Sequence, residues 1–265
     1  MQPLANITPL KPAGAVEVRN VGQIFKTTTQ DVVALEDVSL DVKPGRFVVL
    51  VGPSGCGKST LLMMVAGLRQ QTSGTITISG APIPEPDPNR VGVVFQEASL
   101  FPWLTAEENV EFPLALRGVT KSDRRARAQD ALKLVGLDGF GKRHPHELSG
   151  GMKQRVSIAR GLVQDPPVLL MDEPFAALDE QTRMTMGDEL LRIWAATGKT
   201  VVFVTHSLTE AVYLADEVIV MSPRPGRIVD HLQVSLPRPR TYEMLSGDTF
   251  GRLRDRIWRH IRKSA

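Results

Sequence analysis

A glycine-rich stretch at residues 52–60, GPSGCGKST, places a lysine and two hydroxyl side chains at a spacing that suits a chain of phosphates. Gly, four residues and then Gly-Lys-Ser is the pattern of a phosphate loop, in which glycines let backbone N–H groups close around the phosphates. We expect Lys58 to reach the β and γ phosphates of a nucleoside triphosphate and the Ser59 hydroxyl to bind Mg²⁺. By itself the pattern predicts binding of ATP or GTP. The residues expected to contact the nucleotide here are Gly52, Pro53, Ser54, Gly55, Cys56, Gly57, Lys58, Ser59 and Thr60.

A second anion-binding sequence, LSGGMKQR, lies at residues 148–155. Ser149 is placed to cap the N-terminus of a helix, and Gly150 and Gly151 follow it. The first turn of such a helix carries backbone N–H groups without partners and the positive end of the helix dipole. The sequence therefore predicts a second site that attracts a negatively charged group.

Two adjacent carboxylates follow the apolar run VLLM at residues 168–171. Asp172 is expected at the carboxyl edge of a sheet, where ligands of α/β proteins bind, and it suits a water-mediated contact to Mg²⁺. Glu173 is then positioned to polarise an attacking water. A single acidic residue at a strand end is usually only a surface residue. Two in succession, downstream of a phosphate loop, favour hydrolysis of the bound nucleotide.

The composition is that of an ordinary globular protein, with 42% hydrophobic and 23% charged residues in 265. No apolar run approaches the roughly 18 residues that span a bilayer, and the N-terminus lacks the apolar core of a signal peptide, so we expect a cytoplasmic protein. The single cysteine, Cys56, excludes an internal disulfide and is expected to be a small packing residue. The net charge of +3 is mild, and it does not indicate binding of nucleic acid.

Alternating strand and helix patterns predict an α/β domain with a parallel core sheet. A strand at 46–51 should enter the phosphate loop, and a helix from Ser59 should follow it with an apolar face that extends to Leu68. Thr105 and Glu108 form a possible capping box, and Ser122 is expected to cap a charged helix within an inserted helical subdomain at about 98–160. Further strands are expected at 16–21, 34–42, 75–79, 91–96, 168–171, 200–205 and 217–221, with helices near 180–196 and 208–215.

The order of the two phosphate sequences, with the two carboxylates after the second, resembles the nucleotide-binding domain of ATP-binding-cassette (ABC) proteins. The resemblance implies one domain at 15–265 after a tail at 1–14, with a phosphate-loop NTPase core, an N-terminal antiparallel β subdomain and an inserted helical subdomain. It also implies that ATP and Mg²⁺ bind, and that hydrolysis depends on Lys58, Glu173 and a histidine.

Four further residues receive roles from this resemblance. Gln96 would touch Mg²⁺ and sense the partner subunit, and His206 would hydrogen-bond the γ phosphate, although a lone histidine is more often structural. Asp179 would lie in the loop through which two nucleotide sites communicate, and it could equally cap the following helix. Phe25 stands where the family usually offers a tyrosine to stack on adenine, and its alternative role is a core aromatic of the small sheet.

Met152 departs from the family, which most often has glutamine at this point of the second phosphate sequence. Together with LFPWLTAEENV, MDEPFAALDEQTR, VTHSLTEAVYLAD, SPRPGRI and LPRPR, it makes the chain similar to the ATPases of nitrate, sulfonate and taurine importers. The likeness spans residues from about 16 to the C-terminus.

The resemblance implies a head-to-tail homodimer, in which Ser149, Gly150, Gly151 and Asp179 contact the ATP held by the opposite subunit. It further implies two membrane-spanning permease subunits, a periplasmic or lipid-anchored substrate-binding protein, and a peripheral location on the cytoplasmic face of the inner membrane. The segment at 96–109, with PWL at 102–104, is where a permease would dock. No nucleic-acid partner is expected.

Alternatives remain at two points of the sequence. An exporter ATPase shares the main motifs, and a DNA-repair ATPase shares them too but carries long coiled coils or zinc modules between its two phosphate sites. The second point is the segment at about 248–263, where Phe250, Leu253, Ile257 and Ile261 recur at helical spacing opposite basic residues. This amphipathic helix could pack on the domain or lie on anionic lipid.

Overall fold

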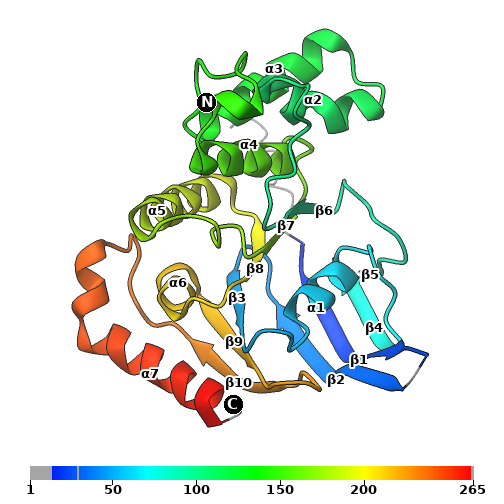
Figure 1. Ribbon diagram of the computed structural model, residues 1–265, viewed down its shortest axis with the longest axis vertical. Helices are drawn as coiled ribbons and strands as arrows, with labels where there is room; N and C mark the ends of the chain where they lie inside the picture. Colours follow the sequence, from blue (N-terminus) through cyan, green and yellow to red (C-terminus); the bar gives the residue numbers. More distant parts are fainter. Residues whose placement is uncertain (1–13, 29, 264–265) are drawn as a thin grey trace, which may run out of the picture.

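Two β-sheets and a group of helices make up residues 14–28 and 30–263, the part of the chain that the computed structural model describes (Figure 1). Nearly all of the tail predicted at 1–14 lies outside these residues. The helices α2, α3 and α4 stand together at one end of the molecule, and the two sheets form the larger body below them (Figure 1). This arrangement agrees with the α/β class predicted from the sequence.

The smaller sheet is antiparallel and has the strand order β2-β1-β4-β5. Its members are β1 (Val16–Lys26), β2 (Asp31–Val42), β4 (Ser73–Ile78) and β5 (Ala81–Pro82). Val16 and Val18 of β1 are buried because alternate residues of the strand face the core, and Val21 is buried after a shift in register between Val18 and Val21. Both β1 and β2 extend beyond the predicted ranges toward the short connection that joins them.

The larger sheet has the order β10-β9-β3-β8-β7-β6, and all its pairs are parallel except the one between β10 and β9. All five residues of β3 are buried, since both faces of the sheet are covered. Phe47 and Val49 belong to one hydrophobic cluster, while Val48 and Leu50 belong to the cluster on the opposite face. Its strands are β3 (Phe47–Val51), β6 (Val91–Val94), β7 (Val168–Asp172), β8 (Thr200–Val204), β9 (Glu217–Met221) and β10 (Ile228–Gln233).

Helix α1 (Lys58–Val65) follows the phosphate loop, and it is shorter than the sequence suggested. The predicted apolar face that extends to Leu68 is wrong, because the helix ends first and Leu68 is 49% exposed. Gly67 adopts a φ of 71°, a conformation that commonly terminates helices, and the Leu68 N–H donates to the carbonyl of Met63.

The helical subdomain contains α2 (Ala106–Leu116), α3 (Lys121–Leu134), a 3₁₀ turn η1 (Pro145–Glu147) and α4 (Gly150–Leu162). The predicted capping box is confirmed, since the Thr105 hydroxyl and the Glu108 carboxylate each accept a bond from the other residue's backbone. The expectation that Ser122 caps α3 is wrong. Thr120 is the cap, because its hydroxyl accepts from the backbone of Asp123 and Ser122 is already inside the helix. Val110 and Leu132 join the same hydrophobic cluster as one face of the large sheet.

The C-terminal segment returns along the body of the molecule. It follows α5 (Glu180–Thr197) and α6 (Leu208–Leu214), and consists of β10, a 3₁₀ turn η2 (Tyr242–Ser246) and α7 (Asp248–Lys263). Phe250 and Ile257 of α7 are 1% and 0% exposed. Leu253 and Ile261 pack against the same cluster. The apolar stripe of the predicted amphipathic helix therefore packs on the domain, as one of the two interpretations of this segment expected.

Candidate functional site

The phosphate loop connects β3 to α1, and its conformation depends on glycine. Gly57 has a φ of 102°, a backbone conformation that is strained for any residue with a side chain. A Cβ atom at this position would also lie 2.5 Å from Leu35 Cδ2. The Lys58 side chain is 5% exposed and folds back on the loop, with Nζ 2.9 Å from the carbonyl of Gly52 and 3.0 Å from that of Pro53. Cys56 is fully buried, as expected for a packing residue. The loop thus has the conformation that phosphate binding requires, and the Lys58 ammonium group lies against it.

Parallel pairing brings the end of β7 next to this loop. Ser59 Oγ donates to Asp172 Oδ1 across 2.9 Å, although the two residues are 113 positions apart in the sequence. Burial raises the pKa of Asp172 above its ordinary value, while the bond from Ser59 opposes this shift. A hydroxyl and a carboxylate oxygen at this distance form the kind of oxygen pair that Mg²⁺ prefers. Ser59 and Asp172, two of the three residues predicted to hold the metal, therefore fit such a site.

Glu173, the second carboxylate, has a φ of 45°, a strained backbone conformation for a residue with a side chain. Its N–H donates to the carbonyl of Val204 in the neighbouring strand, which fixes this conformation. His206 follows β8, and its Nδ1 lies 2.9 Å from Glu173 Oε2. The structure thus brings together a candidate general base and the predicted histidine.

A pocket of about 210 Å³ brings Glu173, but not His206, to the phosphate loop. Phe25 lines it from β1, and is half-buried with the guanidinium of Arg69 5.0 Å above its ring. This places Phe25 at the pocket and outside both hydrophobic clusters of buried residues. The pocket is lined by Phe25, Ala34, Ser54, Gly55, Gly57, Lys58, Ser59, Thr60, Glu173 and Arg224.

Arg224 was not predicted from the sequence to be a residue of this site. Its segment, SPRPGRI, was noted only as a family likeness, and no local pattern indicates that a turn between β9 and β10 reaches the phosphate loop. A lone arginine between two prolines carries no signal of its own.

Gln96 is not brought into this pocket. It is exposed, two residues beyond the end of β6, and no hydrogen bond joins it to Ser59 or Asp172 in the described part of the chain. Its segment is nevertheless held by α4. Gln154 Nε2 donates to the carbonyl of Phe95, and Arg160 donates to the carbonyls of Ala98 and Ser99.

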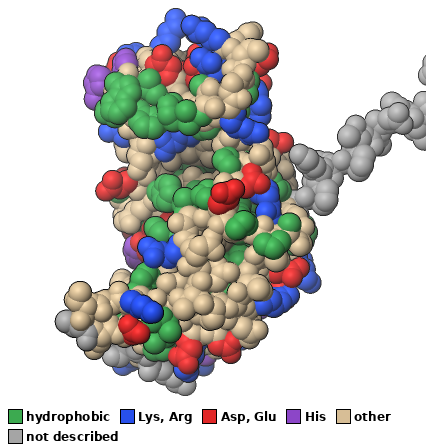
Figure 2. Space-filling view, turned by 90° about the vertical axis from the view of Figure 1, so that its right-hand side faces the viewer, with side chains coloured by type: hydrophobic (Ala, Val, Ile, Leu, Met, Phe, Trp, Pro, Cys, Tyr) green, Lys and Arg blue, Asp and Glu red, His purple; other side chains and the backbone are tan. Residues whose placement is uncertain are grey.

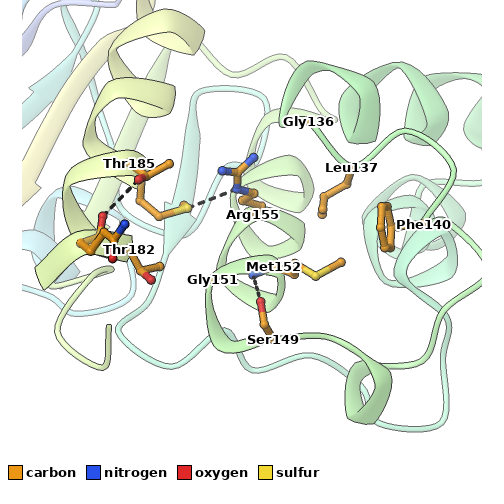
Figure 3. Close-up of a pocket in the computed structure, with 11 residues that line it drawn as sticks. Gly136, Leu137, Phe140, Ser149, Gly151, Met152, Arg155, Thr182 and Thr185 are labelled. Carbon is orange, nitrogen blue, oxygen red and sulfur yellow. Dashed lines mark hydrogen bonds between the residues drawn. The ribbon is translucent and has the colours of Figure 1, made fainter. Parts of the chain in front are cut away.

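The second phosphate sequence lies at a different pocket, of about 420 Å³, at the N-termini of α4 and α5 (Figure 3). Ser149 caps α4 as predicted, with Oγ accepting from the backbone N–H of Met152. Ser149 and Gly150 are exposed, and Gly151 is half-buried. The Met152 side chain extends between Ser149 and Phe140 (Figure 3). This end of α4 therefore presents backbone donors to the surface, where an anion could approach.

Asp179 caps α5 beside this second pocket. Its carboxylate accepts from the Thr182 backbone at 2.9 Å and from the Thr182 hydroxyl at 2.6 Å. These bonds lower the pKa of Asp179. The capping role that the sequence left open is confirmed. No residue of this pocket's lining belongs to the lining of the phosphate-loop pocket.

A groove of about 340 Å³ separates the helical subdomain from the body, and apolar residues dominate its walls. Phe95, Phe101 and Phe112 line it, and the nearby Trp103 is 71% exposed. Figure 2 shows hydrophobic side chains gathered on the upper part of the molecule, with a hollow between that part and the body. An exposed aromatic beside an apolar groove is typical of a protein contact.

Within residues 14–28 and 30–263, no helix has both the length and the apolar character needed to cross a membrane.

Comparison with known proteins gives consistent matches. A family model described as ABC transporter matches residues 35–176. A taurine import ATP-binding protein of Burkholderia pseudomallei is 51% identical over 80% of this chain and 81% of its own. An aliphatic sulfonates import ATP-binding protein of Bacillus cereus is 43% identical over 91% and 94%. A solved dimeric ATP-binding cassette in a post-hydrolysis state, bound to ADP and Pi, is 35% identical, with a TM-score of 0.74, and covers 84% of this chain and 100% of its own.

Proposed function

The chain belongs to the ABC transporter family, and we propose that it is the ATPase subunit of an importer for taurine, other sulfonates or nitrate. It is an ATP hydrolase of the kind that is coupled to transport. The observation that carries the proposal is the convergence of Lys58, Ser59, Asp172, Glu173 and His206 around the phosphate loop. The relatives that supply the substrate class are import proteins, and this favours an importer over an exporter.

The catalytic roles follow from the positions of these groups. The backbone N–H groups of the loop and Lys58 hold the phosphate chain, once Lys58 leaves the carbonyls of Gly52 and Pro53. Glu173 accepts the proton of the water that attacks the γ phosphate. His206 Nδ1, 2.9 Å from Glu173 Oε2, orients that carboxylate, and the contact of His206 with the γ phosphate stays a proposal. Ser59 and Asp172 would hold Mg²⁺, which neutralises phosphate charge when bound.

Phe25 is proposed to stack on the adenine ring. Its half-buried position at the rim of the phosphate-loop pocket supports this role, because a ring in the core would be closed to a ligand. Only the face of the ring is needed, so the absence of the family's tyrosine hydroxyl does not prevent stacking.

The second phosphate sequence is proposed to serve a partner chain. Ser149, Gly150, Gly151 and Asp179 lie away from the phosphate-loop pocket and face the surface. An exposed helix N-terminus next to a surface pocket can bind an anion that another molecule carries. A head-to-tail homodimer would place each ATP between the loop of one chain and Ser149 of the other, and the solved relative is itself dimeric.

The groove beside Trp103 is proposed as the docking site of a membrane-spanning permease, which would hold the chain at the cytoplasmic face of the membrane. The contact of Gln96 with Mg²⁺ and its sensing of the partner subunit stay proposals: its neighbour Phe95 lines the groove and its segment is tied to α4, but Gln96 itself lies outside the phosphate-loop pocket. Two permease subunits and a substrate-binding protein complete the proposed importer.

A growth experiment tests the proposed function. A strain that lacks the gene for this chain is grown with sulfate, taurine or an alkanesulfonate as the only sulfur source, and with nitrate or ammonium as the only nitrogen source. We expect growth to fail on one or more of taurine, alkanesulfonate and nitrate, and to be restored by the wild-type gene but not by Lys58→Ala. Normal growth of the deletion strain on all of them would contradict the proposal.

A further inference from the structure

A turn at residues 222–227, between β9 and β10, is fastened to the phosphate loop. Gly226 approaches the loop so closely that a Cβ atom on it would lie 2.0 Å from the carbonyl oxygen of Cys56. Its N–H donates to the carbonyl of Ala34 at 2.9 Å, and its own carbonyl accepts from Glu36 N–H at 3.1 Å. Only glycine fits at this contact. The turn therefore has a fixed position relative to the loop.

Hydrogen bonds within the turn also fix its shape. Ser222 Oγ accepts from the Arg227 backbone N–H at 2.9 Å and lies 3.0 Å from the carbonyl oxygens of Pro223 and Pro225. Two prolines further limit the backbone conformations that the turn can adopt. The side chain at position 224 thus projects from a stiff support.

Arg224 extends from this support over the mouth of the phosphate loop. Its Nη2 donates to the carbonyl of Gly55 across 3.2 Å, and the exposed side chain lines the same pocket as Ser54, Lys58 and Glu173. A guanidinium has five N–H donors, so one bond to a carbonyl leaves others for a ligand. Lys58, the other cation of this lining, is 5% exposed and bonded to loop carbonyls. Of the two cations that line this pocket, Arg224 is therefore the exposed one.

We propose that Arg224 is a nucleotide-binding residue, whose guanidinium contacts the phosphates of ATP held by the phosphate loop of the same chain. The inference rests on the proposed nucleotide site and adds a residue to it. Arginine suits this role because its planar fork can donate two parallel bonds to phosphate oxygens, whereas lysine offers a point charge. The expected contribution is modest, since the side chain is exposed and its charge is screened by solvent.

Arg227 provides a matched control on the same turn. Its guanidinium pairs with Glu36 at 2.7 Å, its side chain is 56% exposed, and it does not line the pocket. Arg224→Gln and Arg227→Gln each remove one positive charge from the turn. A general effect of net charge or of the turn's stability would weaken nucleotide binding in both variants. Loss of a phosphate contact would weaken it only in Arg224→Gln.

The test measures binding of MgADP and of a non-hydrolysable MgATP analogue to the purified full-length chain by calorimetry. We expect Arg224→Gln to weaken binding of the ATP analogue roughly five- to tenfold, in the range of one exposed charge-assisted hydrogen bond. Arg224→Lys should retain part of the affinity, and Arg227→Gln should bind as the wild type does. The wild-type affinity should fall as salt is raised, and the fall should be smaller in Arg224→Gln.

Two outcomes would overturn the inference. Binding by Arg224→Gln at the wild-type affinity would show that the guanidinium does not contact the phosphates. Equal weakening in Arg224→Gln and Arg227→Gln, together with a lower melting temperature in both, would assign the effect to the turn's fold. Lys58→Ala separates these results from failure of the nucleotide site itself. If Lys58→Ala binds nucleotide as the wild type does, the proposed site is wrong, whatever Arg224 does.

Discussion

The phosphate-loop pocket and the pocket at the start of α4 both lie at the N-terminus of a helix, but different charged side chains surround them. Each places glycines and backbone N–H groups at the beginning of a helix. The phosphate loop faces Glu173, with Asp172 and His206 in bonding contact with members of its pocket. The lining of the α4 pocket has Arg155 as its charged side chain, and contains no carboxylate.

The difference separates chemistry from binding. The phosphate-loop end has the proposed base Glu173, the histidine that contacts it and the carboxylate proposed to hold a metal, which are the groups that hydrolysis of a bound nucleotide needs. Among the described residues that line the α4 pocket there is no carboxylate, and the exposed helix end offers donors for an anion, which favours a binding role. An exposed helix end can bind an anion that another molecule carries, and a second copy of this chain is the proposed carrier.

The largest effect is expected when the base is removed. Glu173→Gln keeps the shape of the side chain but cannot accept the proton of the attacking water, and we expect hydrolysis to fall by about 10²- to 10⁴-fold. ATP binding should persist, because the phosphate loop is unchanged, and an ATP-bound dimer should accumulate. Phosphate release and gel filtration measure the two properties. Hydrolysis near the wild-type rate would remove Glu173 from its proposed role.

Thiol labelling compares the two pockets directly. Cys56 in the phosphate loop is fully buried, whereas Ser149 is exposed, so a cysteine introduced by Ser149→Cys should react at least about tenfold faster than Cys56. Mass spectrometry distinguishes the two positions within one sample. In a Glu173→Gln background, MgATP should slow labelling at 149, because the nucleotide of a partner chain covers it. Equal labelling at 149 with and without nucleotide would argue against that cover.

Two aspartates should affect stability with opposite signs. Asp172 is half-buried, and its pKa is raised by burial, so its ionised form opposes folding at neutral pH. Asp172→Asn should raise the melting temperature of the nucleotide-free chain by about 2–4 °C while lowering hydrolysis, because Asn can still accept from Ser59. A fall in melting temperature, measured calorimetrically, would show that the charge is well compensated.

Asp179 should show the smaller, opposite effect. Its pKa is lowered by the bonds from Thr182, so its contribution to stability is present above the ordinary value of 3.8 and is lost as the pH falls through the lower folded value. Asp179→Asn can still cap α5, and we expect a decrease in melting temperature of about 1 °C at pH 7. The difference from the wild type should close once the pH has fallen through the lowered pKa of Asp179. A difference that persists there would assign it to packing.

The sequence predicted the elements whose signals are local. The capping box at Thr105 and Glu108, the cap at Ser149 and the buried strands of the large sheet all follow from residues within a few positions of one another. The convergence of Ser59 with Asp172 was also predictable, because the carboxyl ends of parallel strands share one edge.

The predictions that were wrong or missing concern features set by tertiary contacts, or positions where two nearby residues suit the same role. Ser122 and Thr120 are both good caps two residues apart, and the local pattern does not choose between them. The end of α1 before Leu68 depends on the conformation of Gly67. Strand β10 pairs antiparallel to β9 along the edge of a parallel sheet, and Arg224 reaches the phosphate loop only because the turn between these strands folds against Cys56.

Mixing two inactive chains tests the shared site most directly. Ser149→Arg damages the α4 end, and Lys58→Ala damages the phosphate loop, so each homodimer should be inactive. With different affinity tags, the mixed dimer can be purified in two steps and has one intact composite site. A mixed dimer of wild type and Lys58→Ala, prepared in the same way, shows how fast one intact site works alone.

We expect the dimer of Ser149→Arg with Lys58→Ala to hydrolyse ATP at a rate close to that of this control, while neither mutant homodimer is active. This result requires that Ser149 of one chain completes the phosphate loop of the other. If the control dimer is active and the dimer of the two mutants is silent, each chain uses its own Ser149, and the division between a catalytic end and a binding end that serves a partner is contradicted.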